Sequence, residues 1–139
     1  MTTNGTLNHG IIIRKIANTV LHAFCDADLG GDQDHYTSTT GYVTFIGPNP
    51  ISWSSKKQRA LLCSTTEAEF RGIAETTKEI LLLQNLLSEL HIKNSKPPTI
   101  FCDNLSATNY SANPILHSRM KHLALSFHFV RQHVQNGSL

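Results

Sequence analysis

The sequence predicts a mixed α/β fold in which one mixed β-sheet is covered by helices. Two apolar segments of strand length, 20–27 and 99–104, each carry aspartates toward their carboxyl ends. Between them lie a pair of polar strand-like segments and a long segment with apolar residues at three- and four-residue steps, which is typical of a helix packed on a core. This order of elements favours a sheet with helices on it.

The first residues of the chain do not have the pattern of a domain core. Residues 1–8 are polar and rich in turn formers, and 10–14 is a short β-branched run. That run is interpreted either as an edge strand or as the remnant of an upstream segment. We therefore assign 1–19 to an N-terminal connecting segment and 20–139 to one domain, a length that suits a single hydrophobic core.

The segment 20–27 is predicted to be the central strand. Its apolar run shows no one-sided alternation, which favours burial on both faces. Asp26 and Asp28 stand at its carboxyl end, on one face if the strand continues that far. Ionised carboxylates there are costly unless they are paired, hydrogen-bonded or bound to a metal. Because Asp103 ends the second apolar strand in the same way, the sequence predicts a site for a hard cation such as Mg²⁺.

A hairpin is predicted between these two strands. Segments 41–46 and 51–55 have strand composition, and Gly47-Pro48-Asn49-Pro50 between them predicts a four-residue turn. A basic cluster follows the hairpin: Lys56, Lys57 and Arg59. Such a cluster is either a solvated loop or a contact for phosphate groups, and the sequence leaves both interpretations open.

Ser64-Thr65-Thr66-Glu67 matches a capping box and predicts the start of a helix that runs to about residue 91. Glu67 then has a structural role at the third helical position. Glu69 is not needed for the cap, so it is either free to face a metal or remains a solvated acid favoured by the helix dipole. Further on, 105–112 is predicted to be a short helix and 123–135 a final amphipathic helix.

Composition bounds the possible functions only loosely. The net charge of +2 does not by itself indicate nucleic-acid binding, although no Asp or Glu follows Asp103 and the last quarter is basic. The three cysteines lack metal-ligand spacing and are expected to be small buried thiols in a reducing compartment. With no signal-peptide pattern and no apolar run of about 18 residues, we expect an intracellular protein without a membrane span.

Several stretches resemble the ribonuclease H domain of copia-type retrotransposon Pol polyproteins, in the order in which that family has them. They are HAFCDAD at 22–28, YTSTTGY at 36–42, ISWSSKKQ at 51–58, STTEAEFR at 64–71, CDNLSA at 102–107, KH at 121–122 and HFVR at 128–131. The resemblance covers roughly residues 10–139. It implies a ribonuclease H-like fold and the cutting of the RNA strand of RNA–DNA hybrids, inside a polyprotein that also contains reverse transcriptase and integrase.

The resemblance also implies a set of site residues. The carboxylates of the family fall on Asp26, Glu69 and Asp103, which would be both catalytic and metal-binding, with Mg²⁺ or possibly Mn²⁺ as the cofactor. In two-metal hydrolysis the ions are roughly 3.5–4 Å apart, and Asp26 would bridge them. The candidate contacts for the phosphates of the hybrid are Lys56, Lys57, Arg59, Arg119 and Lys121.

Three departures from the family pattern stand out. Leu29 replaces a usual Trp, and Ser126 stands where an acid is common. The fifth strand and last helix of the family, with its fourth metal-site aspartate, would follow residue 139, so we expect a C-terminally truncated copy with impaired activity. Two alternatives remain: a non-catalytic remnant that binds nucleic acid or metal weakly, and a phosphotransferase of the haloacid dehalogenase type, whose nucleophile strand 24–28 resembles.

Overall fold

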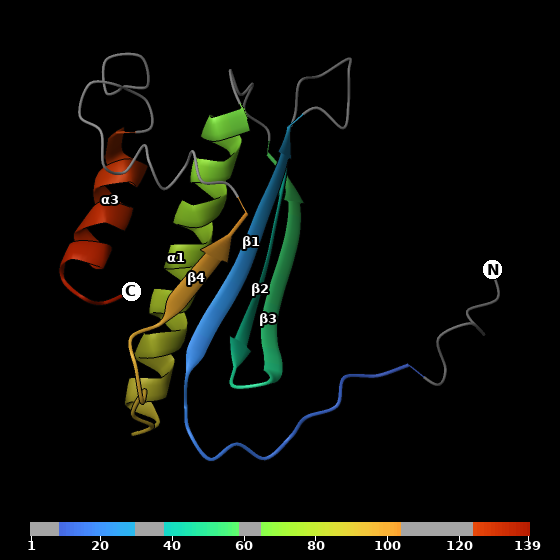
Figure 1. Ribbon diagram of the computed structural model, residues 1–139, viewed down its shortest axis with the longest axis vertical. Coiled ribbons are helices and arrows are strands. Elements are labelled where there is room, and N and C mark those ends of the chain that lie inside the picture. The colour runs from blue at the N-terminus through green and yellow to red at the C-terminus, as the bar shows by residue number, and fades with distance from the viewer. Residues whose placement is uncertain (1–8, 30–37, 59–64, 104–123) are drawn as a thin grey trace.

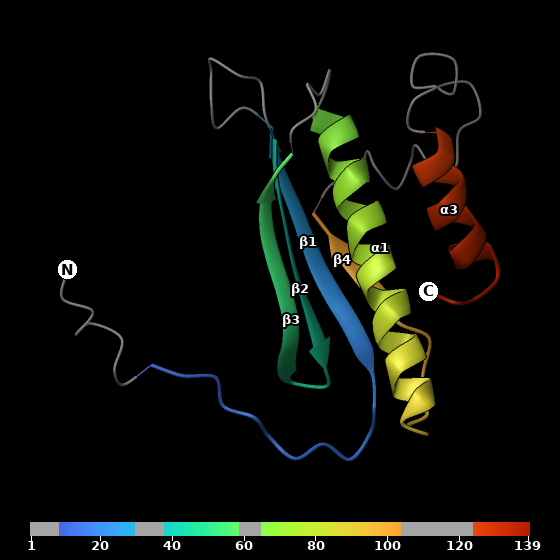
Figure 2. The same ribbon diagram turned by 180° about the vertical axis from the view of Figure 1, so that it is seen from behind.

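The protein was analysed as a computed structural model that describes residues 9–29, 38–58, 65–103 and 124–139. These residues form a four-stranded mixed sheet with two helices on one side of it (Figures 1 and 2). The elements are β1 (Leu21–Leu29), β2 (Ser38–Ile46), β3 (Asn49–Lys57), α1 (Thr65–Glu89), β4 (Thr99–Cys102) and α3 (Ala124–Gln135). The predicted α/β class, with a mixed sheet and covering helices, is confirmed.

The strand order is β3-β2-β1-β4. β1 runs antiparallel to β2 and parallel to β4, and β2 and β3 form an antiparallel hairpin. Parallel pairing requires a crossover connection, and α1 supplies it by packing back across the sheet. β1 and β4 therefore point toward the same end of the sheet, the end at which α1 begins (Figure 1). β4 ends beside Cys25, whereas β1 continues past this point to Leu29.

β1 is central, but the prediction that it is buried on both faces is wrong for the described part of the chain. Leu21, Ala23 and Cys25 are buried beneath α1, whereas Phe24 points to the other face and is 47% exposed. The sequence of β1 did not show an alternation of buried apolar and exposed polar residues, because the uncovered face also carries aromatic side chains. The rings of His22 and Phe45 stack at 5.1 Å, and Phe24 and Phe101 do the same across β1 and β4.

The hairpin is tighter than the four-residue turn that the sequence predicted. Ile46 pairs directly with Asn49, which leaves a two-residue turn with Gly47 at a φ of 55°. Asn49 is buried, and its side chain both accepts from the backbone N–H of Arg14 at 2.7 Å and donates to the carbonyl of Arg14 at 2.8 Å. These bonds fix Asn49 within β3 and tie down the N-terminal segment.

The segment 10–14 does not form the edge strand that was one of its two interpretations. Its three isoleucines are 53–73% exposed, and the Asn49 side chain, rather than a neighbouring strand, satisfies the Arg14 backbone groups. The predicted helix at 105–112 and the cap residue Ser64 lie outside the described residues.

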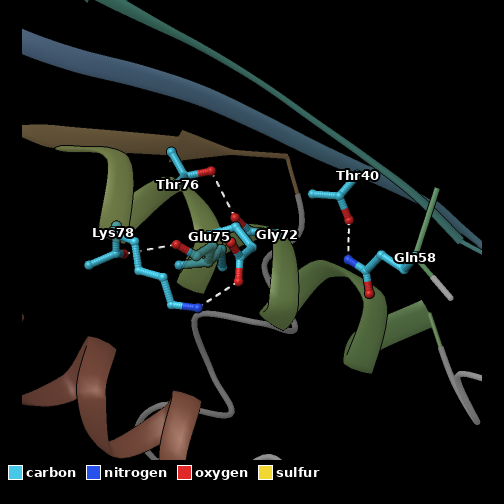
Figure 3. Close-up of polar contacts among 8 residues, drawn as sticks. Thr40, Gln58, Gly72, Glu75, Thr76 and Lys78 are labelled. Carbon is cyan, nitrogen blue, oxygen red and sulfur yellow. Dashed lines mark hydrogen bonds and ion pairs between the residues drawn. The ribbon is translucent and has the colours of Figure 1, made fainter. Parts of the chain in front are cut away.

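Two apolar clusters hold α1 in place. Ile80 and Leu87 pack on Leu21 and Ala23 of β1, and a second cluster joins the first half of α1 to Val130 of α3. Two fully buried threonines also face inward on α1, and their hydroxyls donate to the carbonyl four residues earlier: Thr76 to Gly72 at 2.7 Å and Thr77 to Ile73 at 2.8 Å. Figure 3 shows the first of these bonds.

α3 ends as the sequence predicts. Gly137 adopts a φ of 69°, and the N–H of Ser138 closes the helix by donating to the carbonyl of His133 at 2.9 Å. Neither helix in the described part of the chain has the length and apolar character needed to cross a membrane.

The core position of Ile80 gives a stability prediction with an internal control. Ile80→Ala should lower the free energy of unfolding by about 2–5 kcal/mol, because it leaves a cavity between α1 and β1. Leu82, two residues further along α1, is 60% exposed. Leu82→Ala should therefore cost less than about 1 kcal/mol. Urea unfolding of both variants, followed by circular dichroism, makes the comparison, and equal losses would contradict the packing described here.

Candidate functional site

The three carboxylates predicted from the sequence line one small pocket. The pocket has a volume of about 10 Å³ and is formed by Cys25, Asp26, Ala27, Glu69, Cys102 and Asp103. That volume is close to the minimum needed to hold one water molecule. Three elements far apart in the sequence thus contribute to it: β1, the first turns of α1, and the end of β4.

The register of the two parallel strands explains this arrangement. Cys25 of β1 pairs with Cys102 of β4, so Asp26 and Asp103, the next residue after each, lie at the same level. Asp26 is still within β1, where it pairs with Gly41 of β2, whereas Asp103 follows the end of β4. Glu69 reaches the same place because α1 begins at this end of the sheet (Figure 1). The carboxyl ends of neighbouring parallel strands are a common location for ligand sites in α/β sheets.

The carboxylates share the pocket without forming a closed cluster. Among the residues that the structure describes, no three His, Cys, Asp or Glu side chains converge on one point as a preformed metal-binding group. Asp26 and Asp103 are both exposed to solvent. The donor set of three carboxylates nevertheless fits a hard, oxygen-preferring cation such as Mg²⁺ or Mn²⁺.

Gly72 sets how closely α1 approaches this end of the sheet. A Cβ atom at this position would lie 3.2 Å from Cγ2 of Thr40, 3.7 Å from Cβ of Ala27 and 4.0 Å from the carbonyl oxygen of Asp26. Thr40 has little freedom to yield, because it is buried and its hydroxyl accepts a hydrogen bond from Nε2 of Gln58 (Figure 3). Glu69 stands one helical turn before Gly72, so this close contact also fixes the distance of Glu69 from β1.

Glu67 and Glu69 occupy different environments although they are two residues apart. Glu67 is 2% exposed, and its Oε1 lies 3.3 Å from Nη2 of Arg71, one turn further along α1. Glu69 is half-buried and faces the pocket. This difference agrees with a structural role for Glu67 and leaves Glu69 as the candidate for the site.

Two pocket residues, Cys25 and Cys102, were not singled out as site residues from the sequence. Burial, together with the neighbouring Cys102, raises the pKa of the Cys25 thiol to about 12, so Cys25 is a neutral thiol at physiological pH. A signal was present: each cysteine immediately precedes a site aspartate, Asp26 or Asp103, at the end of an apolar strand.

Of the predicted phosphate contacts, the structure describes only Lys56 and Lys57. Both are exposed at the end of β3 and pair with Thr40 and Thr39 of β2, in the same rows of the sheet as the end of β1. They lie two strands from β1, which corresponds to roughly 10 Å at the usual strand spacing. The remaining candidates lie outside the described residues: Arg59, Arg119 and Lys121.

The tight contact at Gly72 predicts an unusual response to alanine. In a helix interior, Gly→Ala usually stabilises by about 1 kcal/mol. Gly72→Ala should instead be neutral or destabilising, because its methyl group meets Thr40. Thr40→Ser removes the Cγ2 atom involved, so the double variant should recover the expected gain. Urea unfolding of the two single variants and the double variant measures this coupling, and simple additivity would contradict the contact.

No model of a protein family matches the chain, whereas individual proteins do. The retrovirus-related Pol polyproteins from transposons RE1 and RE2 of Arabidopsis thaliana are 52% and 53% identical to it over 97% of its length. That from transposon TNT 1-94 of Nicotiana tabacum is 38% identical over 88%. The chain spans 9% of the length of each of these relatives. Over nearly its whole length, the chain is therefore similar to one short region of retrotransposon Pol polyproteins.

Proposed function

We propose that this chain is a ribonuclease H-like domain of the copia type that hydrolyses the RNA strand of RNA–DNA hybrids. The observation that carries the proposal is the shared pocket of Asp26, Glu69 and Asp103, which come from three separate elements. The similarity to Pol polyproteins of transposons supports the same assignment, because copying RNA into DNA produces such hybrids. In that setting the domain would act beside reverse transcriptase and integrase.

The positions of the carboxylates suggest different roles. Asp26 lies within β1, the neighbour of β4 in the sheet, and would be the carboxylate shared by two cations. Glu69 belongs to α1 and Asp103 follows β4, and each would complete one ion site. Mg²⁺ or Mn²⁺ held there would activate the attacking water and stabilise the leaving oxygen.

Binding of the hybrid is assigned to basic residues outside the pocket. Lys56 and Lys57 are exposed at the end of the sheet that carries the carboxylates, where they can contact phosphates without reading sequence. Arg59, Arg119 and Lys121 are proposed for the same task. Discrimination between RNA and DNA would depend on the 2′-hydroxyl groups in the wide minor groove of the hybrid.

The proposed metal site can be tested apart from catalysis. Titration of the chain with Mn²⁺, followed by calorimetry, should show binding that Asp26→Asn weakens at least tenfold, in line with losses at metal sites. Asp28→Asn is the matched control, because Asp28 lies on the same strand and is also exposed, but does not line the pocket. Equal affinities of the two variants would remove Asp26 from the site.

Cleavage of a labelled RNA–DNA hybrid tests the activity. The 139 residues supply three carboxylates to the proposed metal site, and they contain no Asp or Glu after Asp103. The family resemblance implies four carboxylates at this site. We expect slow cleavage in Mg²⁺ and faster cleavage in Mn²⁺, lost in Asp103→Asn. A longer polypeptide that supplies the fourth carboxylate should cut at least tenfold faster, the scale of losses at incomplete metal sites. Brisk Mg²⁺-dependent cleavage by these residues alone would show that three carboxylates suffice.

A second candidate is a non-catalytic domain that binds hybrid or metal weakly. It is favoured by the lack of a preformed three-ligand group among the described residues. The cleavage experiment distinguishes the two candidate functions. Hybrid binding and Mn²⁺ binding without any cleavage, even in the longer polypeptide, would support the non-catalytic domain.

A further inference from the structure

Two thiols stand side by side directly beneath the carboxylate pocket. Cys25 and Cys102 are register partners on the parallel strands β1 and β4, and both line the pocket. Both lie on the side of the sheet that α1 covers: Cys25 is buried there, and Cys102 shares a second cavity with Phe70, Ile73 and Thr77 of α1. Both are reduced in the structure.

This placement suits a disulfide between the two strands. Neighbouring strands lie about 4.8 Å apart, and disulfides join Cα atoms that are about 4.4–6.8 Å apart. Two register partners on one face meet this condition without a change in strand pairing. An oxidant can also reach one of them, because the second cavity, about 600 Å³ between α1, β4 and α3, is bordered by Cys102.

We propose that Cys25 and Cys102 form a reversible disulfide that couples oxidation to the geometry of the carboxylate pocket. Hydrogen peroxide would first oxidise the more accessible Cys102 thiol to a sulfenic acid, with release of one water. The Cys25 sulfur then attacks the Cys102 sulfur while the Cys25 thiol gives its proton to the departing hydroxyl. The S–O bond breaks, and a second water leaves as the S–S bond forms. Two thiols are oxidised and one peroxide is reduced.

The bond would act on the site because each cysteine is followed directly by a site carboxylate. Linking the two sulfurs fixes the separation and tilt of β1 and β4 at the level from which Asp26 and Asp103 project. A pocket of about 10 Å³ has little tolerance for such a change. We therefore expect the oxidised chain to bind Mn²⁺ at least tenfold more weakly, the scale seen when the supports of metal ligands are altered. This link to the metal rests on the proposed function, whereas the disulfide itself does not.

The test uses the full chain carrying Cys63→Ser, since Cys63 lies outside the described residues and would otherwise offer a third thiol. After treatment with hydrogen peroxide, mass spectrometry should find a monomer that has lost two hydrogens and a peptide that links Cys25 to Cys102. Dithiothreitol should reverse both. The same peptide mapping of the wild-type chain keeps the test valid if the Cys63→Ser variant folds poorly.

Two further measurements separate this proposal from the proposed function. The backbone amide resonances of Asp26 and Asp103 should shift when the chain is oxidised, with or without a cation. In Cys102→Ala the same treatment with hydrogen peroxide should leave them where they were before it. If the reduced chain binds no Mn²⁺, the proposed metal site is disproved. The amide shifts still test whether the disulfide changes the geometry of the pocket. The proposal is overturned if peroxide oxidises Cys102 without linking it to Cys25. It is also overturned if the disulfide forms but changes neither the amide shifts nor the Mn²⁺ affinity of a chain that binds Mn²⁺ when reduced.

Discussion

The in-register parallel pairing of β1 with β4 is the constraint on which the candidate site depends. A Cys-Asp pair lies within β1 and another at the end of β4, and only the match of Cys25 with Cys102 brings both aspartates to one level. A slip by one residue would turn one of the two side chains to the opposite face of the sheet. The pairing therefore decides at once whether the acids share a pocket and whether the thiols face each other.

α1 serves the core and the site through different parts of its length. Its second half is anchored by Ile80 and Leu87 on β1, far from the carboxylates. Its first half carries Glu69 and is brought close to the sheet at Gly72, where no side chain separates helix from strand. Because the helix is rigid, anchoring at one end and close approach at the other leave Glu69 little freedom relative to Asp26.

The sheet is asymmetric in a way that explains both its stability and its surface. One face is closed by α1, while the described part of the other face carries stacked aromatic side chains, with Trp53 63% exposed and Phe101 49% exposed. Ring stacking across β1 and β4 supports the parallel pair from this open side. The strands are thus held together by ring contacts on one face and by the buried clusters under α1 on the other.

The sequence by itself determined the α/β class, the strand that carries Asp26, the strand that leads into Asp103, the hairpin, and the extent of α1. These depend on local periodicity and on turn and cap residues. It also separated Glu67 from Glu69 by their positions relative to a predicted cap. It did not reveal that β1 is covered on one face only, since the uncovered face carries the rings of His22 and Phe24 and so lacks the charged residues typical of a solvated face. Nor did it give the two-residue turn, which depends on Asn49 bonding to the distant Arg14. The pairing of Cys25 with Cys102 was decided by the tertiary structure alone, because register between strands more than 70 residues apart is set by how α1 packs across the sheet.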